Sequence, residues 1–300
     1  MNTVLKWAGS KSRIMAEITK HLPAGERLVE PFAGSCAVMM NTDYPAYLVA
    51  DVNPDLINLY RQIKDNSRQF IILAFRAFAE NRTQESYYSI REAFNHHLGL
   101  PLLERAAYFL YLNRNGYRGM CRYNQKGNFN IPFGNYTEPY FPLEEIKAFA
   151  EKAKRATFIC ADFTETLNML KTGDVVYCDP PYDDTFADYH SGGFGKDKQY
   201  ELASVLSDVA TRHPVIASNS HTRLVKSLYR QFDLHQITAP RSIGVAAGKG
   251  KSAEEIIAVS RPVGTVVKHA YPAVFPGYPG HFGTDMAEGQ DWSASVEVKS

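Results

Sequence analysis

The chain has 300 residues, of which 45% are hydrophobic, 12% aromatic and 22% charged, a composition typical of a globular protein with one large domain or two smaller ones. Its formal net charge of +1 excludes a strong attraction of the whole molecule to nucleic acid. The longest apolar runs, such as AAYFLYL from Ala106, are too short to cross a bilayer and the N-terminus lacks a signal-peptide core, so we expect a cytoplasmic protein with no membrane partner.

The first sheet elements come early in the chain. The sequence RLVEPFAGSCAVMMN predicts a strand over 28–30, a turn over 31–35 and a helix from about Cys36, and AYLVAD predicts a second strand that ends at Asp51. This succession is typical of a nucleotide-type α/β sheet. Because Gly34 is the only glycine in the turn, the phosphate-binding pattern G-x-G-x-x-G is absent, and a cofactor without phosphates fits better.

Helical periodicity follows the second strand, with apolar residues three and four positions apart in PDLINLYRQI, RQFIILAFRAFAEN, SYYSIREAFNHHL and PLLERAAYFLYLN. A turn-rich segment comes next, and strands resume in KRATFICADF, DVVYCDPPY, PVIASNS, DLHQITAPRS and EEIIAVS. We therefore predict a discontinuous sheet domain over 1–54 and 143–262, a helical insertion over 55–142, and a C-terminal tail of unknown role over 263–300.

Basic and aromatic residues alternate in one part of the chain. From Arg105 to Thr137 the basic residues are accompanied by tyrosines and phenylalanines, and no acidic residue occurs. Such interleaving is typical of a nucleic-acid face, although a solvated basic helix and loop would have the same composition.

Two acidic positions allow more than one interpretation. The stretch DVVYCDPPY ends a predicted strand over 175–179 at two prolines, which cannot donate to a sheet ladder. The tetrapeptide that begins at Asp179 is therefore either an ordinary turn that ends the strand or a rigid segment that holds the aspartate in a fixed position. Asp51 is either a ribose ligand or a residue of a turn or helix cap.

The cysteines and histidines do not indicate a metal site. The four cysteines are too far apart for a C-x-x-C pattern, and the paired histidines at 96–97 lack further ligands at suitable spacing. We interpret the cysteines as reduced thiols and predict no metal.

Six motifs occur in the order LKWAGSKSRI, VEPFAGSC, DVNPDLINLY, LNRNGYRGMCRYNQKGNFNIPFG, DPPY followed by YHSGGF, and SNSH. Together, from Val4 to about Pro262, they resemble the DNA adenine-N6 methyltransferases of the Dam type, D12 class, in which the cofactor motif precedes the catalytic one. The resemblance implies a Rossmann-like S-adenosylmethionine-dependent methyltransferase sheet with an inserted helical target-recognition domain. It also implies an adenine-specific enzyme of bacterial or phage type acting on double-stranded DNA, for which we infer no obligate protein partner.

The resemblance also assigns the S-adenosylmethionine site. Asp51 would accept both ribose hydroxyls, and Lys11 would pair with the carboxylate of the methionine moiety. Asp162 would accept the exocyclic amine of the cofactor's adenine, while Phe163 would cover its ring. The implied cofactor-binding residues are Trp7, Gly9, Lys11, Glu30, Phe32, Ala33, Gly34, Asp51, Asp162 and Phe163.

The implied catalytic residues are Asp179, Pro180 and Tyr182. The N6 amine of adenine is a poor nucleophile because its lone pair is delocalised into the ring. If the carboxylate of Asp179 and the carbonyl of Pro180 each accept one amino hydrogen, the lone pair turns towards the methyl donor. Tyr182 would stack on the adenine.

The target base must leave the duplex to reach such a pocket. By resemblance, Tyr117 would fill the vacated position and Arg122 would read a guanine edge, as in relatives that recognise GATC. Lys6 would touch the first guanine. The implied DNA-binding residues are Lys6, Tyr117, Arg118, Met120, Arg122 and Pro132.

Two other functions remain open. A catalytically silent DNA-binding module would keep the basic aromatic segment but has no use for Asp179, Tyr182 and Asp51 together. A methyltransferase acting on another amine or amide would typically carry asparagine in place of Asp179 and would lack the long insertion.

Overall fold

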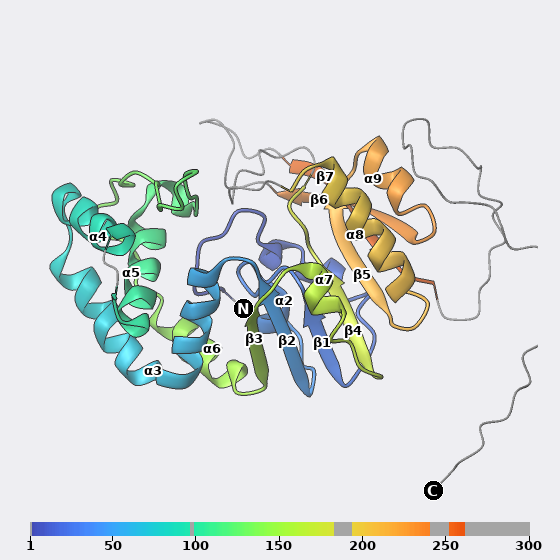
Figure 1. Cartoon of the computed structure of the whole chain (residues 1–300), viewed down its shortest axis with the longest axis horizontal. Helices are drawn as coiled ribbons and strands as arrows, with labels where there is room; N and C mark the ends of the chain where they lie inside the picture. The colour runs from blue at the N-terminus through green and yellow to red at the C-terminus, as the bar shows by residue number, and fades with distance from the viewer. Residues whose placement is uncertain (1, 97–98, 183–193, 241–251, 262–300) are drawn as a thin grey trace, which may run out of the picture. The chain divides into compact units, whose positions relative to one another are not determined.

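A computed structural model describes residues 2–96, 99–182, 194–240 and 252–261. The strands in this part of the chain are β1 (Arg27–Glu30), β2 (Ala46–Asp51), β3 (Ala156–Cys160), β4 (Asp174–Cys178), β5 (Val215–Ser220), β6 (Asp233–Pro240) and β7 (Ser252–Val259). They form one seven-stranded sheet in the order β3-β2-β1-β4-β5-β7-β6 (Figure 1). The strands from β3 to β5 are parallel, and β7 runs antiparallel between β5 and β6. The predicted Rossmann-like α/β fold is therefore confirmed.

The two central strands are apolar because both faces of the sheet are covered. In β1, Leu28 packs into one apolar core and Val29 into another. In β4, Val175 and Tyr177 belong to the first core and Val176 belongs to the second. This alternation has the two-residue period of a strand, and burial on both faces is typical of parallel sheets.

Short helices cover the two faces. Helix α1 (Met15–Ile18) precedes β1, and the helices between strands include α2 (Ala37–Asn41), α7 (Phe163–Leu167), α8 (Lys196–Val209) and α9 (Arg223–Leu228). Ile18 and Met39 pack in the core with Leu28, whereas Leu202 packs in the core with Val29. The sheet thus lies between helical layers, and its strand ends are fixed by packing on both sides.

The helical insertion lies beside the edge strand β3 (Figure 1). Its helices are α3 (Pro54–Glu80), α4 (Gln84–His96) and α5 (Leu102–Asn115), and α6 (Leu143–Ala153) leads back to the sheet. On α3, the Arg61 guanidinium donates to the carbonyl of Phe158 at 2.7 Å and the Lys64 Nζ donates to that of Ala156 at 2.8 Å. These bonds fasten the insertion to β3 through backbone acceptors.

Several predicted boundaries require correction. The two helices predicted after Asp51 form one helix, α3, which is interrupted by non-helical backbone angles at Asn66. The helix predicted from Cys36 begins at Ala37, because Cys36 has a left-handed backbone with φ of 55°. The strand predicted over 175–179 is shifted by one residue, so Asp179 follows β4 and does not belong to it.

By their contacts, the described residues all belong to one compact unit. The predicted division between sheet and insertion domains at 54/55 and 142/143 remains a prediction, and the tail over 263–300 lies outside the described residues. Among the described helices, none has the length and apolar character needed to span a membrane.

Candidate active site

Acidic residues mark the carboxyl ends of the parallel strands. Glu30 ends β1, Asp51 ends β2, and Asp179 directly follows β4. The strand order reverses between β1 and β4, which are neighbours in the sheet. In open α/β sheets, such a reversal opens a crevice at the carboxyl ends of the strands where ligands bind. The three acids therefore lie at the edge where a ligand site is expected.

A cleft of about 1190 Å³ opens at this edge. Its lining contains all ten predicted cofactor-binding residues and all three predicted catalytic residues. Of the predicted DNA-binding residues, Lys6 and Met120 also line it, whereas Tyr117, Arg118, Arg122 and Pro132 do not. The sheet edge and the N-terminal segment thus share one cavity with part of the insertion.

Asp51 holds the turn after β1 close to the end of β2. Its Oδ2 accepts from the backbone N–H of Gly34 at 3.1 Å, and its Oδ1 accepts from that of Asn53 at 3.0 Å. The cap of α3 is Asn53, whose Oδ1 accepts from the backbone N–H groups of Asp55 and Leu56. The helix-cap interpretation of Asp51 is therefore wrong, although it does form a local turn. Its ribose role remains a prediction.

At Gly34, the backbone itself forms part of the cleft wall. Its φ of +44° disfavours any residue with a side chain, and an added Cβ would lie 3.0 Å from Nε1 of Trp7. The indole of Trp7 thus occupies the space that a side chain at residue 34 would need. A ligand in the cleft can approach the backbone of this turn closely.

Glu30 is a buried acid at the base of the cleft. Burial raises the pKa of Glu30 to about 8, and the charge of Asp179 adds to this shift. Its Oε1 has no hydrogen-bond partner within the described part of the chain. A buried oxygen without a partner is costly, so this oxygen is suited to bind a polar group of a ligand.

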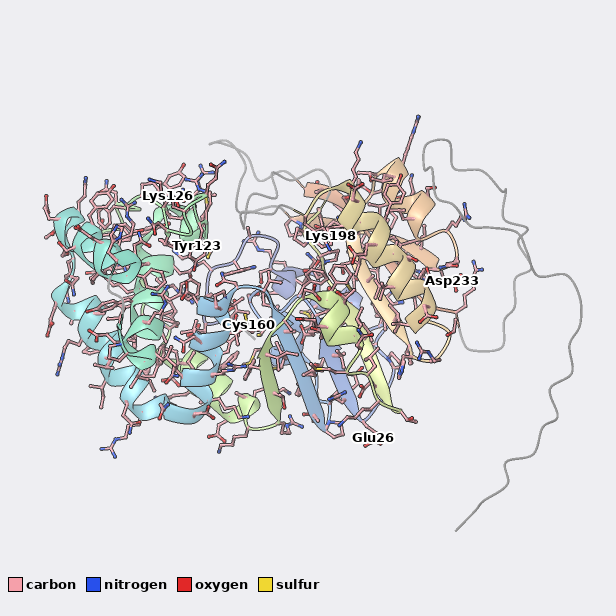
Figure 2. All side chains as sticks on the ribbon, in the orientation of Figure 1. Glu26, Tyr123, Lys126, Cys160, Lys198 and Asp233 are labelled. Carbon is pink, nitrogen blue, oxygen red and sulfur yellow. The ribbon has the colours of Figure 1, made fainter. Side chains whose placement is uncertain are left out.

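Three aromatic rings form another wall. The rings of Phe32 and Phe163 stack with centroids 5.8 Å apart, and Phe194 meets Phe32 edge-on at 5.6 Å. Lys198 of α8, labelled in Figure 2, places Nζ 5.6 Å from the centroid of Phe163. Asp162 begins α7 and accepts from the backbone N–H of Glu165 at 2.8 Å. The sequence interpretation assigned Phe32, Asp162 and Phe163 to the site; it gave no role to Lys198 or to Phe194, which ends the quoted YHSGGF motif.

Asp179 lies in a charged corner of the cleft, with 19% of its side chain exposed. Its Oδ1 is 2.9 Å from Nζ of Lys11, which also donates to the carbonyl of Gly9 at 2.8 Å. Burial raises the pKa of Asp179 to about 6, and the ammonium of Lys11 opposes that shift. Lys11 pairs here with the predicted catalytic acid, so its predicted contact with a methionine carboxylate remains untested.

A buried polar chain supports the segment after Asp179. Gln199 of α8 donates from Nε2 to the carbonyl of Pro181 at 2.7 Å. Asn219 of β5 in turn donates to Oε1 of Gln199 at 3.1 Å. Both side chains are buried, so this carbonyl is held by a satisfied network. In the sequence, Asn219 stands in the SNSH motif and Gln199 is a polar residue inside the amphipathic pattern of α8, but neither was assigned this supporting role.

The loop over 116–134 carries most of the predicted DNA-binding residues. Its base is closed where the backbone N–H of Tyr117 donates to the carbonyl of Pro132 at 2.8 Å. The Tyr117 side chain is exposed, and the guanidinium of Arg118 lies 5.2 Å from its ring centroid. Arg122 is exposed, and its Nε donates to Oδ1 of Asn130 at 2.8 Å. These side chains face solvent on a closed loop.

Buried side chains connect the 116–134 loop to the rest of the molecule. The Tyr123 hydroxyl donates to Oδ2 of Asp55 at 2.7 Å, and Arg105 pairs with the same carboxylate (Figure 2 labels Tyr123). Asn113 donates to the carbonyls of Lys6 and Gly119 at 2.9 and 3.0 Å. The loop is therefore fixed both to the start of α3 and to the N-terminal segment. The sequence interpretation named neither connection.

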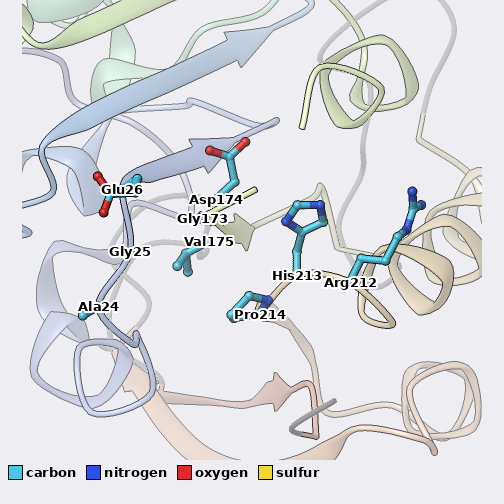
Figure 3. Close-up of a pocket in the computed structure, with 9 residues that line it drawn as sticks. All are labelled: Ala24, Gly25, Glu26, Gly173, Asp174, Val175, Arg212, His213 and Pro214. Carbon is cyan, nitrogen blue, oxygen red and sulfur yellow. The ribbon is translucent and has the colours of Figure 1, made fainter. Parts of the chain in front are cut away.

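A second, smaller cavity of about 190 Å³ lies at the opposite edge of the sheet (Figure 3). It is lined by residues that precede or begin β1, β4 and β5, among them Glu26, Asp174 and His213. It contains no predicted site residue. Within the described residues, no group of three or more His, Cys, Asp or Glu side chains could hold a metal ion.

The sheet order, a switch-point cleft without a phosphate loop, and an Asp-Pro-Pro-Tyr segment that follows β4 and lines this cleft define the class as an α/β methyltransferase. Comparison with known families gives the particular family. The chain belongs to the D12 class N6 adenine-specific DNA methyltransferases, whose family model matches residues 7–243. It is therefore an adenine-specific DNA methyltransferase with DNA as its substrate, and the resemblance predicted from the motifs is confirmed.

Curated relatives agree with this family. The chain is 58% identical over 300 residues to the retron Ec67 DNA adenine methylase of Escherichia coli, covering 100% of both proteins. It is 42% identical over 265 residues to the DNA adenine methylase of Escherichia coli strain K12, covering 86% of this chain and 95% of that protein. The DNA adenine methylase of Vibrio cholerae is 42% identical over 266 residues, with the same two coverages. The first alignment includes the cleft and the 116–134 loop.

Proposed function

We propose that the protein transfers the methyl group of S-adenosylmethionine to N6 of an adenine that is flipped out of GATC in double-stranded DNA. The observation that carries this proposal is the largely enclosed carboxylate of Asp179, whose side chain is 19% exposed and lines the same cleft as the predicted cofactor residues. One cavity can thus hold a methyl donor beside an acceptor for the amine that receives the methyl group.

The cleft is suited to S-adenosylmethionine by its shape and its polar groups. The backbone at Gly34 permits close approach, and the free oxygen of Glu30 can accept from a ligand donor. The ring wall around Phe163 can cover an adenine ring. When bound, S-adenosylmethionine supplies a methyl group on a positively charged sulfur. The other requirements of the reaction fall to side chains and carbonyls of this chain.

The catalytic task of Asp179 is to orient the target amine. Its carboxylate would accept one amino hydrogen while the carbonyl of Pro180 accepts the other, which localises the nitrogen lone pair for attack. The transferred methyl group forms a bond to N6 as its bond to sulfur breaks, and the amine then loses a proton. The neighbouring carboxylate of Asp179 would accept that proton. Tyr182 would present the face on which the adenine stacks.

The 116–134 loop would read the target sequence. Its exposed Arg122 can make a bidentate contact with a guanine, and its exposed Tyr117 can replace a flipped base in the stack. Lys6 lies beside this loop, because an added Cβ at Gly119 would meet its side chain at 2.3 Å. This close packing supports a single reading surface formed by the loop and the N-terminal segment.

The proposal is tested by incubating the protein with labelled S-adenosylmethionine and a plasmid that contains GATC sites. We expect label in the DNA and resistance of the plasmid to a nuclease that cuts only unmethylated GATC. A plasmid without GATC sites, treated in parallel, should stay unlabelled. Label without protection would contradict the target sequence, and absence of label from every DNA would contradict the proposed donor or reaction.

Replacing Asp51 by alanine tests the cofactor site. We expect Asp51→Ala to weaken S-adenosylmethionine binding about ten- to a hundredfold, because hydrogen bonds to a charged acceptor contribute about 1.5–3 kcal/mol. Calorimetric titration of the isolated protein measures this affinity. Glu26→Ala, an exposed acid at the opposite edge of the sheet, is the control and should bind as the wild type does. Equal affinities for all three proteins would leave Asp51 as a residue of the turn only.

A further inference from the structure

Glu255 is a buried acid for which the proposed reaction has no role so far. It lies on β7, where the following residues Ile256, Ile257 and Ala258 are apolar and buried. Only 7% of Glu255 is exposed, and it lines the large cleft. A carboxylate inside an apolar strand is costly unless it is paired, so its partners indicate what it does.

Its partners are two residues of the catalytic corner. The Tyr182 hydroxyl donates to Oε2 of Glu255 at 2.8 Å. The same oxygen is 4.0 Å from Nζ of Lys11, which is 2.9 Å from Oδ1 of Asp179. Nζ of Lys11 also lies 4.7 Å from the centroid of the Tyr182 ring. Two carboxylates, one ammonium and one phenol thus form a single cluster, in which Lys11, Tyr182 and Glu255 are buried.

We propose that Glu255 is a positioning residue for methyl transfer: it holds the ring of Tyr182 for stacking and receives Lys11 when the target amine takes its place on Asp179. The inference rests on the proposed function, because it assumes that Asp179 accepts the amine. Before the base enters, Lys11 occupies the acceptor that the base needs. A second carboxylate 4.0 Å away gives the ammonium a charged partner, so it need not remain buried and unpaired.

The negative charge of Glu255 also affects the protonation of Asp179. The titratable groups around Asp179 include Lys11, Glu255, Tyr182, Glu30, Tyr177 and Cys178. Of these, Lys11 and Tyr182 lower its pKa and Glu255 raises it. Loss of the Glu255 charge should therefore lower the pKa of Asp179. Asp179 would then keep its accepting carboxylate to lower pH.

Two substitutions of Glu255 distinguish its hydrogen bond with Tyr182 from the effect of its negative charge. Glu255→Gln keeps an oxygen that can accept from the Tyr182 hydroxyl but lacks the charge, whereas Glu255→Ala loses both. For Glu255→Gln we expect the acid limb of the kcat profile to move to lower pH. For Glu255→Ala we expect kcat/KM on GATC DNA to fall about tenfold or more, the size expected for losing a hydrogen bond to a charged group.

The neighbouring Glu254 provides a matched control. It is exposed on β7 and accepts from Thr238 on the adjacent strand. Glu254→Gln removes the same charge from the same strand and should leave the kcat profile and kcat/KM unchanged. Cofactor titration shows whether each variant retains a folded cleft.

The outcomes distinguish the inference from the function on which it rests. A wild-type protein that does not methylate DNA would contradict the proposed function itself. An active wild type with unchanged kcat/KM in Glu255→Ala and an unmoved acid limb in Glu255→Gln would overturn the role of Glu255. If Glu255→Ala loses the cleft, Glu255→Gln decides alone: an acid limb shifted relative to Glu254→Gln supports the role, and an identical profile rejects it.

Discussion

Replacing Asp179 by alanine is expected to lower the rate of methyl transfer at least about a hundredfold, because one positioned electrostatic partner commonly contributes about 2.7–4 kcal/mol to a transition state. DNA binding should remain, since the Asp179 carboxylate lies inside the cleft, paired with Lys11, and is not a surface contact for phosphates. Single-turnover methylation of GATC DNA measures the chemical step, and fluorescence anisotropy with the same duplex measures binding. Near-normal turnover in Asp179→Ala would disprove the proposed catalytic role.

The same residue determines an expected pH dependence. Because burial raises the pKa of Asp179 to about 6, the carboxyl is ionised above this pH and becomes protonated below it. A protonated carboxyl loses accepting capacity, so kcat of the wild type should fall as the pH falls through about 6. Asp179→Asn serves as the control. It has nearly the same size but cannot titrate, so its residual activity should lack this acid limb.

The sheet could be predicted from the sequence because local signals agree with tertiary structure there. The strand predicted to end at Asp51 and the strand predicted over residues 214–220 are present, since short apolar runs bounded by turn residues are also the buried centre of the sheet. The sequence predicted two separate helical segments here, and it did not show that they form one helix interrupted at Asn66. The two predicted segments are joined in one helix whose first half packs Tyr60 on Phe149 of α6 and whose second half packs Phe78 on Tyr111 of α5.

The candidate site could be predicted where a residue belongs to a motif in the sequence. Asp51, Asp179 and Tyr182 stand in such motifs, and the structure brings them into one cleft. Glu255 could not be assigned to the cleft in this way, because its partners Tyr182 and Lys11 lie 73 and 244 positions away and meet it only through the order of the strands. A buried acid in an apolar strand indicates that a partner exists but does not identify it.

The sequence predicted roles for side chains of the 116–134 loop. It did not predict the contacts that hold these side chains in place. Nε of Arg122 donates a hydrogen bond to Asn130. Among the described residues, this is the hydrogen bond that the Arg122 side chain makes. The terminal nitrogens, which form the fork that matches O6 and N7 of guanine, remain available for a base. Tyr117 is exposed at the closed base of the loop. One residue is thus suited to hydrogen bonding and the other to stacking.

Arg122→Ala and Tyr117→Ala should therefore fail in different ways. A bidentate contact with guanine contributes about 1–3 kcal/mol of discrimination, so Arg122→Ala should methylate DNA altered at that base pair almost as well as GATC. Tyr117→Ala should keep the GATC preference but flip the target less, because the vacated position is no longer filled by a stacked ring. Methylation rates on GATC and on singly substituted sites measure the first effect. The fluorescence of 2-aminopurine at the target position measures the second, and it should be reduced in Tyr117→Ala.

A different result is expected if both residues contact only phosphates or pack only within the loop. Each substitution would then weaken binding to all sequences alike, and Arg122→Ala would reduce the salt dependence of binding by about one phosphate contact. Measuring both variants at two salt concentrations separates these cases, because loss of a base contact changes the ratio between sites whereas loss of a phosphate contact changes the slope with salt. Lys126→Ala is a suitable control, since Lys126 is exposed on the same loop and has no assigned contact with a base (Figure 2). Losses of equal size on every site for Arg122→Ala would refute its assignment as the residue that reads guanine.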